Sequence, residues 1–244
     1  MEPVLSVKNV RKNFGALKVA DDISFDVHAG EALGVIGPNG AGKSTLFNLI
    51  AGALPVSSGT ILFSDADITA MPASRRCRLG IGRSFQIPSP FTGMSVYENL
   101  AVAASFGCEV HDDPEAECRA LLEMTGLLAK ANLPAGALTL LERKRLELAR
   151  ALATRPHLLL LDEIAGGLTE AECQALVTTI KGIREAGVSI IWIEHIVHAL
   201  TAVVDRLIVI DFGKIVAQGD PRKVMADPLV QEIYMGIEVD EHAA

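Results

Sequence analysis

The sequence has few cysteines, and their spacing is not that of a structural framework. Its 244 residues include four cysteines, with no Cys-x-x-Cys pair and no His and Cys residues at the spacing of a metal site. A disulfide framework and a zinc site are therefore disfavoured. The four positions are Cys77, Cys108, Cys118 and Cys173.

An excess of basic side chains is also lacking. Lys and Arg number 22 against 30 Asp and Glu, which gives a formal net charge of −8. A chain of this charge has no broad attraction for the phosphates of nucleic acids or for anionic lipids. We therefore expect no nucleic-acid partner.

Long uninterrupted apolar segments are absent as well. The most apolar stretches, residues 158–161 and 189–210, are too short or are interrupted by side chains such as Glu194 and His198. Neither stretch predicts a transmembrane helix. Residues 1–5 lack the basic start and the apolar run of a signal peptide, so we expect the protein not to be exported.

The apolar patterns that are present predict a single α/β domain. Half of the residues are hydrophobic and 21% are charged, which is enough apolar surface for a sizeable core. Residues 23–28 alternate as in a half-buried strand of an antiparallel N-terminal subdomain. Residues 158–161 and 188–193 are continuous apolar runs, as in a parallel sheet covered on both faces. We also predict a mostly helical insert at about 87–155 and a short helical tail at about 220–244.

A phosphate-binding loop is the most specific motif. Residues 37–44 match G-x-x-x-x-G-K-[ST] between a predicted strand and a predicted helix, as in a P-loop NTPase core. In such a loop the backbone N–H groups surround a phosphate chain, Lys43 reaches the β- and γ-phosphates and the Ser44 hydroxyl binds Mg²⁺. The alternative is a glycine-rich turn without a ligand, which the flanking strand and helix disfavour. The predicted nucleotide-binding residues are Gly37, Pro38, Asn39, Gly40, Ala41, Gly42, Lys43, Ser44 and Thr45.

Two adjacent carboxylates follow the apolar run at 158–161. Asp162 and Glu163 end a predicted buried strand, where a parallel sheet places its ligand crevice. Adjacent residues on a strand point to opposite sides, so we assign Mg²⁺ binding to Asp162 and activation of the attacking water to Glu163. The alternative is a polar strand end with solvated acids. The sequence has no Asn-Lys-x-Asp motif for guanine, which disfavours a GTPase.

Two further side chains complete the predicted catalytic group. His195 follows the next apolar run, where an imidazole can hydrogen-bond a γ-phosphate or orient the water. Gln86 can offer its carbonyl to Mg²⁺ and reach the attacking water. The alternatives are a structural histidine at a strand end and an ordinary surface glutamine, and the ordered motifs favour the catalytic interpretation.

The order of these motifs resembles that of the ATP-binding subunits of ABC transporters. Along nearly the whole chain the phosphate loop is followed by Gln86, a signature region near Leu138, Asp162 with Glu163, and His195. Five elements in the family's order are far more specific than one. The resemblance implies one ATP-binding domain over the full length, with the helical insert as its signature subdomain.

The resemblance also implies ATP hydrolysis between two subunits. Each ATP, with Mg²⁺, would lie between the phosphate loop of one subunit and the signature helix of the other, which includes Thr139 and Glu142. The second subunit would be a copy of this chain or a different ATPase. Phe14 would stack on adenine, and its alternative is a place in the core.

Several segments look like the ATPase subunits of branched-chain amino-acid importers, a group that also serves urea and other small solutes. They are residues 82–88 (GRSFQIP), 94–100 (MSVYENL), 219–221 (GDP) and 234–236 (YMG). The likeness implies permease subunits as partners, indirect contact with a solute-binding protein, and a peripheral place on the cytoplasmic face of the inner membrane. The rival hypothesis is a soluble regulatory ABC-type ATPase, but such relatives usually carry two cassettes or long coiled coils.

Two segments depart from the family's usual pattern. The signature, usually Leu-Ser-Gly-Gly-Gln, reads LTLLE at residues 138–142, so that Leu140 and Leu141 replace both glycines. We expect a site completed by this signature to hydrolyse ATP more slowly, unless both leucines turn into the core of the helical subdomain. After Glu163, Ile164 stands where proline is usual and Thr169 where aspartate is common.

Overall fold

An antiparallel sheet forms from the N-terminal part of the chain. In the computed structural model, which describes residues 2–107 and 113–235, its strand order is β2-β1-β4-β5. Ile23, Phe25 and Val27 are buried and the residues between them are exposed, which confirms the predicted alternation. The strands are β1 (Pro3–Phe14), β2 (Leu17–His28), β4 (Ser58–Phe63) and β5 (Ala66–Asp67).

A second sheet carries the strands that lead to the predicted site. Its order is β10-β9-β3-β8-β7-β6, and all neighbouring pairs are parallel except β9 with β10. The predicted parallel sheet is therefore confirmed. Its strands are β3 (Ala32–Ile36), β6 (Ile81–Arg83), β7 (Leu158–Asp162), β8 (Ser189–Ile193), β9 (Arg206–Asp211) and β10 (Lys214–Gly219).

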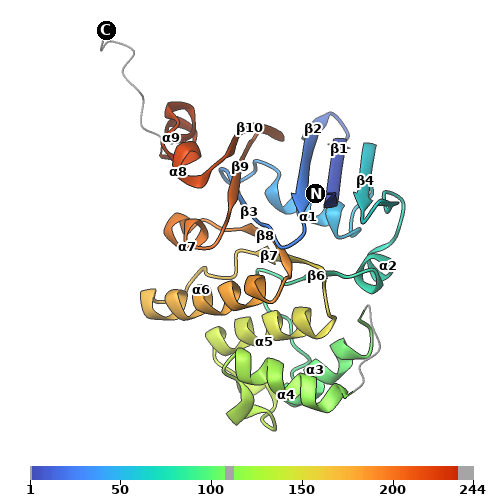
Figure 1. The fold of residues 1–244 in the computed structure, drawn as a ribbon, viewed down its shortest axis with the longest axis vertical. Helices are drawn as coiled ribbons and strands as arrows, with labels where there is room; N and C mark the ends of the chain where they lie inside the picture. The colour runs from blue at the N-terminus through green and yellow to red at the C-terminus, as the bar shows by residue number, and fades with distance from the viewer. Residues whose placement is uncertain (1, 108–112, 236–244) are drawn as a thin grey trace.

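Both faces of this central sheet are buried, because successive side chains point to opposite faces. Leu158 and Leu160 pack in a core shared with the antiparallel sheet and α1 (Lys43–Ile50). Leu159 and Leu161 pack on the other face, in a core shared with α5 (Leu140–Ala153), α6 (Glu170–Glu185) and α7 (Val197–Thr201). Figure 1 shows α6 and α7 on one side of the central strands and the antiparallel sheet on the other.

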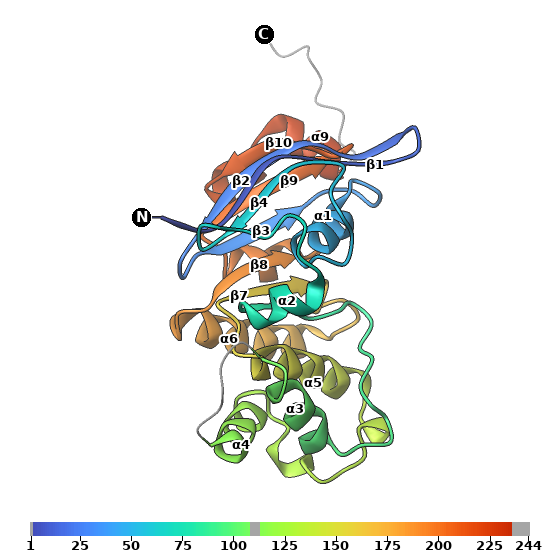
Figure 2. The ribbon, with the colours of Figure 1, turned by 90° about the vertical axis from the view of Figure 1, so that its right-hand side faces the viewer.

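A helical part lies at the end of the molecule away from the antiparallel sheet, as Figure 2 shows. It has its own core, to which Val96, Leu122 and Leu146 contribute. Its elements are α3 (Val96–Ala104), α4 (Pro114–Met124), α5 (Leu140–Ala153) and the short 3₁₀ helices η1 (Leu128–Lys130) and η2 (Ala135–Ala137). The remaining helices are α2 (Ala73–Arg78), α8 (Pro221–Met225) and α9 (Pro228–Met235).

The predicted C-terminal tail is partly covered by the structure. Residues 236–244, and residues 108–112 of the predicted helical insert, lie outside the described part of the chain. Within the described residues, no helix has the length and apolar character that a bilayer crossing requires.

Candidate functional site

The phosphate loop connects the end of β3 to the start of α1, and two of its glycines are required by close contacts. A Cβ on Gly37 would lie 2.0 Å from the carbonyl oxygen of Ile210. A Cβ on Gly42 would lie 2.4 Å from the carbonyl oxygen of Val19, and Gly42 has a left-handed φ of 103°. Gly42 is the N-cap of α1 without a side-chain cap, so the first N–H groups of the helix are available to an anion.

Lys43 folds its ammonium group back over this loop. Its Nζ donates to the carbonyl oxygens of Gly37 at 2.6 Å and Pro38 at 3.0 Å, and the residue is 5% exposed. Burial lowers the pKa of Lys43, and the charges of Glu163 and Asp162 oppose this effect. The cation therefore lies on the loop, and it interacts electrostatically with the two predicted site carboxylates.

Asp162, at the end of β7, is paired with an arginine that the sequence analysis missed. Arg83 Nη2 lies 3.0 Å from Asp162 Oδ2, and Arg83 Nη1 donates to Asn48 Oδ1 at 2.6 Å. Burial raises the pKa of Asp162, and the hydrogen bond and charge of Arg83 oppose this effect. The guanidinium also stacks on Phe85 at 4.9 Å. A basic residue at the end of β6, next to β7 in the sheet, was the only signal for this pair.

The three predicted Mg²⁺ ligands come from neighbouring segments at one edge of the sheet. Ser44 lies in the first turn of α1, Gln86 follows β6 and Asp162 ends β7. Hydroxyl, amide and carboxylate oxygens are the donors that Mg²⁺ prefers, and the carboxylate is buried beside a cation that Mg²⁺ could replace. The donor set therefore fits this ion. No cluster of three or more His, Cys, Asp or Glu offers another metal site in residues 2–107 and 113–235.

The structure brings the three predicted catalytic side chains into direct contact. Glu163 Oε1 lies 2.6 Å from His195 Nε2, and Gln86 Nε2 donates to Glu163 Oε2. Glu163 follows β7 with a φ of 46°, a backbone conformation that is unusual for a residue with a side chain and is often found at functional sites. These contacts join the ends of β6, β7 and β8 at one point.

A buried carboxylate behind His195 holds two loops together. Glu194 is 1% exposed, and its Oε1 accepts from the backbone N–H of His195 at 3.0 Å. Its Oε2 accepts from the backbone N–H of Ala165, in the loop after Glu163, at 2.9 Å. Burial raises the pKa of Glu194, and these hydrogen bonds oppose the increase. Glu194 has no predicted role, although a carboxylate at the end of an apolar run was an available signal.

The signature residues cap their own helix. Thr139 is the N-cap of α5, and Thr139 and Glu142 form a capping box in which each side chain bonds the other's backbone N–H. Glu142 also pairs with Lys130, and these contacts lower its pKa. Leu140 is 55% exposed, so the alternative that places both leucines in the subdomain core is wrong for Leu140. Between the described residues, no hydrogen bond or ion pair joins Thr139 or Glu142 to the phosphate loop of the same chain.

Phe14 lies at the end of β1, on the surface. Its side chain is 48% exposed, and Lys12 Nζ lies 5.1 Å from the ring centroid. The alternative that placed this ring in the core is therefore wrong. An exposed aromatic face is available for stacking.

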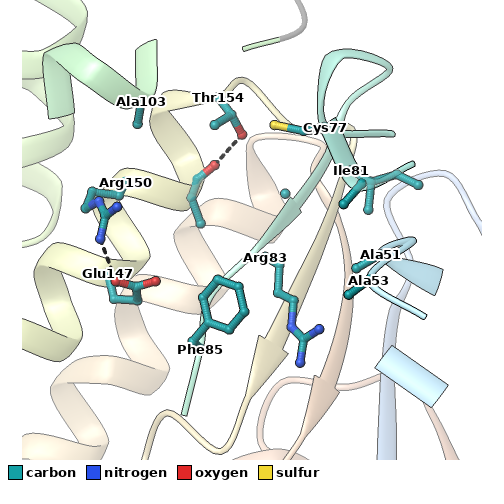
Figure 3. Close-up of a pocket in the computed structure, with 13 residues that line it drawn as sticks. Ala51, Ala53, Cys77, Ile81, Arg83, Phe85, Ala103, Glu147, Arg150 and Thr154 are labelled. Carbon is teal, nitrogen blue, oxygen red and sulfur yellow. Dashed lines mark hydrogen bonds and ion pairs between the residues drawn. The ribbon is translucent and has the colours of Figure 1, made fainter. Parts of the chain in front are cut away.

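A groove opens between the helical part and the rest of the molecule, next to Gln86. In Figure 3, Glu147 and Arg150 of α5 line one side, and Ala51 and Ala53 line the other. The volume of the groove is about 280 Å³. The remaining lining residues are Ala73, Cys77, Ile81, Gly82, Arg83, Phe85, Ala103, Ala151 and Thr154.

The loop at the mouth of this groove is held by α5. Arg150 Nη1 donates to the carbonyl oxygen of Ser89 at 3.1 Å, and its guanidinium carbon lies 5.1 Å from the ring centroid of Phe91. Phe91 is 47% exposed and Ile87 is 76% exposed. The loop therefore presents apolar side chains to solvent.

Comparison with known proteins gives one consistent family. The family model described as ABC transporter matches residues 20–166. A probable ABC transporter ATP-binding protein of Azorhizobium caulinodans is 36% identical, over 97% of this chain and 84% of that protein. Two proteins of Escherichia coli K12 are each 34% identical to this chain. The lipopolysaccharide export system ATP-binding protein LptB matches over 95% of this chain and 97% of its own length. The high-affinity branched-chain amino acid transport ATP-binding protein LivG matches over 96% of this chain and 98% of its own length.

Solved structures agree with these relatives. The ADP conformation of MJ1267, an ATP-binding cassette of an ABC transporter, has a TM-score of 0.89 and 30% identity, covering 97% of this chain and all of that one. CbiO1 of Clostridium perfringens, part of the ABC transporter complex cbiONQ, has a TM-score of 0.81 and 26% identity over 97% of this chain and all of its own. The similarity therefore covers the whole fold as well as the motifs.

Proposed function

The chain belongs to the ATP-binding proteins of ABC transporters, and we propose that it powers the import of branched-chain amino acids or related small polar solutes. Membership follows from the family model over residues 20–166 and from relatives that match almost the full length. The protein is accordingly an ATPase. The LivG relative and the four segments similar to branched-chain importers support import, whereas the equally similar LptB relative makes export the competing direction.

The contact of Glu163 with His195 and Gln86, beside the phosphate loop, is the observation that carries the mechanism. We assign Glu163 as the general base that accepts a proton from the attacking water. Each carboxylate oxygen already has one partner, and each can accept a second hydrogen bond from that water. His195 orients Glu163 and the γ-phosphate, while Gln86 links the base to the Mg²⁺ site.

The remaining site residues bind and orient ATP. Residues 37–45 would surround the phosphates with backbone N–H groups, and Lys43 would exchange its two carbonyl partners for phosphate oxygens. Phe14 would stack on adenine. Mg²⁺, held by Ser44, Gln86 and Asp162, would neutralise charge on the β- and γ-phosphates.

The second subunit would complete the site. In this proposal the N-terminus of its α5, with the capping pair Thr139 and Glu142, faces the γ-phosphate across the dimer, because helix N–H groups carry positive partial charge. The chain would work on the cytoplasmic face of the membrane with permease subunits and, indirectly, with a solute-binding protein. The groove beside Gln86 would receive a cytoplasmic helix of the permease.

Glu163→Gln tests the mechanism. The amide fills the same space but accepts no proton, so we expect ATP turnover to fall by about 10²- to 10⁴-fold while ATP binding persists and a dimer with trapped ATP accumulates. Glu170→Gln, at the exposed start of α6, is the matched control and should turn over ATP as the wild type does. Turnover of Glu163→Gln near the wild-type rate would remove Glu163 from its proposed role.

The same variant tests the direction and the solute. Cells that carry Glu163→Gln in place of the wild-type gene should lose uptake of labelled leucine or of labelled urea and retain normal export of lipopolysaccharide. Unchanged uptake of both solutes would refute the proposed solute class without affecting membership of the family.

A further inference from the structure

Three groups of His195 each contact a different side chain. The backbone N–H donates to Glu194 Oε1 at 3.0 Å, and the ring Nε2 lies 2.6 Å from Glu163 Oε1. The third contact comes from the far end of the chain, where the hydroxyl of Tyr234 donates to the carbonyl oxygen of His195 at 3.0 Å. Helix α9 therefore reaches the catalytic group directly.

Tyr234 is fixed in place by the packing of α9. Val230, one turn earlier on the helix, is fully buried in the core on the α6 side of the central sheet, and the half-buried ring of Tyr234 packs against the same core. Burial raises the pKa of Tyr234, and the charges of Glu194 and Glu163 raise it further. The hydroxyl therefore keeps its proton and acts as a donor at neutral pH.

The segment that Tyr234 holds is also held by Glu194, whose carboxylate is hydrogen-bonded to the backbone N–H groups of His195 and Ile196. His195 lies between the end of β8 and the start of α7, and Ile196, the N-cap of α7, provides no side-chain cap. Displacement of the His195 carbonyl would move its Cα, and with it the ring relative to Glu163. The hydrogen bond from Tyr234 fixes the carbonyl end of the peptide after His195, and Glu194 fixes its N–H end together with the N–H of His195.

We propose that Tyr234 is a positioning residue for ATP hydrolysis, which holds the backbone of His195 so that its ring stays on Glu163. The inference rests on the proposed role of His195. It assigns to the C-terminal helix, 39 residues further along the chain, a part in setting the rate of the chemical step. The ring of Tyr234 supplies the packing, and only its hydroxyl supplies the positioning.

Tyr234→Phe separates the two contributions, because it keeps the ring and removes only the donor. We expect kcat for ATP hydrolysis by the full chain to fall about threefold to tenfold, as for the loss of one hydrogen bond to a critical group. KM and the Kd for ATP should stay unchanged, because the phosphate loop is not altered. Tyr97→Phe is the matched control: it removes the other tyrosine hydroxyl, in α3, and should leave kcat, KM and Kd as in the wild type.

The result that overturns the proposal is distinct from failure of the proposed mechanism. Wild-type kcat in Tyr234→Phe, together with an inactive His195→Ala, would show that Tyr234 only packs α9. An increase in KM or Kd equal to the loss of kcat would also exclude positioning, because it would indicate a general loss of nucleotide binding. Wild-type turnover in His195→Ala would overturn the role of His195 and the positioning role together.

Discussion

At the scale of single residues, Lys43 shows how the site is prepared for a polyanion. Its ammonium group is buried and hydrogen-bonded to two carbonyl oxygens of the phosphate loop, and it interacts electrostatically with Glu163 and Asp162. Phosphate oxygens would replace neutral carbonyl acceptors with charged ones, and a charge-assisted hydrogen bond is roughly twice as strong. The ammonium group is thus already placed to form these stronger hydrogen bonds with a bound phosphate.

Lys43→Ala should therefore weaken ATP binding strongly. The loss of hydrogen bonds to a charged group reduces the binding free energy by about 1.5–3 kcal/mol. We therefore expect the Kd from a nucleotide titration to rise roughly 10- to 150-fold. Lys181→Ala, on the exposed side of α6, removes the same charge away from the site and is the control. An unchanged Kd in Lys43→Ala would contradict the assignment of the phosphate loop.

The residues that were predictable from the sequence are those marked by their immediate neighbours. Lys43 belongs to a contiguous motif, and Asp162 follows a run of leucines that can only be a buried strand or helix. Arg83 and Tyr234 were not predictable, because their contacts depend on strand order and on the docking of α9. A single sequence does not state that β6 lies beside β7 or that α9 ends near β8.

At the scale of elements, the N-terminus of α5 is well capped, but it also carries an exposed leucine side chain. The capping box and the pair of Glu142 with Lys130 satisfy the helix end without glycine. Leu140 nevertheless projects into solvent from the first turn. In a dimer of the proposed type, this branched side chain would keep the helix N–H groups farther from the partner's γ-phosphate than glycine would.

Replacement of Leu140 and Leu141 together by glycine should therefore raise the ATPase rate of the assembled transporter. The double replacement by alanine is the control for the loss of apolar side chains, and it should give a smaller increase because Cβ remains. ATP turnover at saturating nucleotide is the measurement. An unchanged rate in the glycine variant would mean that the leucine signature does not limit hydrolysis.

At the same scale, the elements themselves were largely predictable, and their exact arrangement was not. The alternation at Ile23, Phe25 and Val27 and the apolar runs before Asp162 and His195 gave the correct strand types, because each reflects which faces are covered. The strand β1 and the order of the two sheets were not predicted. Pairing between β1 and β2 is set by contacts along the whole hairpin, which no single window of sequence contains.

At the scale of the whole molecule, the groove beside Gln86 runs between the helical part and the rest of the molecule, and Leu148, Ala151 and Leu152 of α5 join the two by packing in the core of the central sheet. The helical part has its own core, and the loop with Ser89 and Phe91 crosses its boundary, tied to α5 by Arg150. Exposed Ile87 and Phe91 give this boundary an apolar rim. A permease helix seated there would contact both parts at once.

A cysteine in place of Ser89 should therefore crosslink to a cytoplasmic loop of the permease in the intact complex. Cys77 lines the groove and should first be replaced by alanine, so that the reaction reports position 89. Thr178→Cys, on the exposed side of α6, is the control and should give no such product. Failure of the position 89 variant to reach any permease subunit would argue against docking at this groove.

Because both faces of the central sheet are buried in separate cores, substitutions on the two faces should have separate effects. Leu159 and Leu160 are neighbours in sequence, yet they pack in different cores and share no side-chain layer. Sequence drift on one face can therefore proceed without repacking the other, because sites with no common partners act independently. At the edge where the site residues follow their strands, Glu163 and His195 contact each other directly, so substitutions there act together instead of independently.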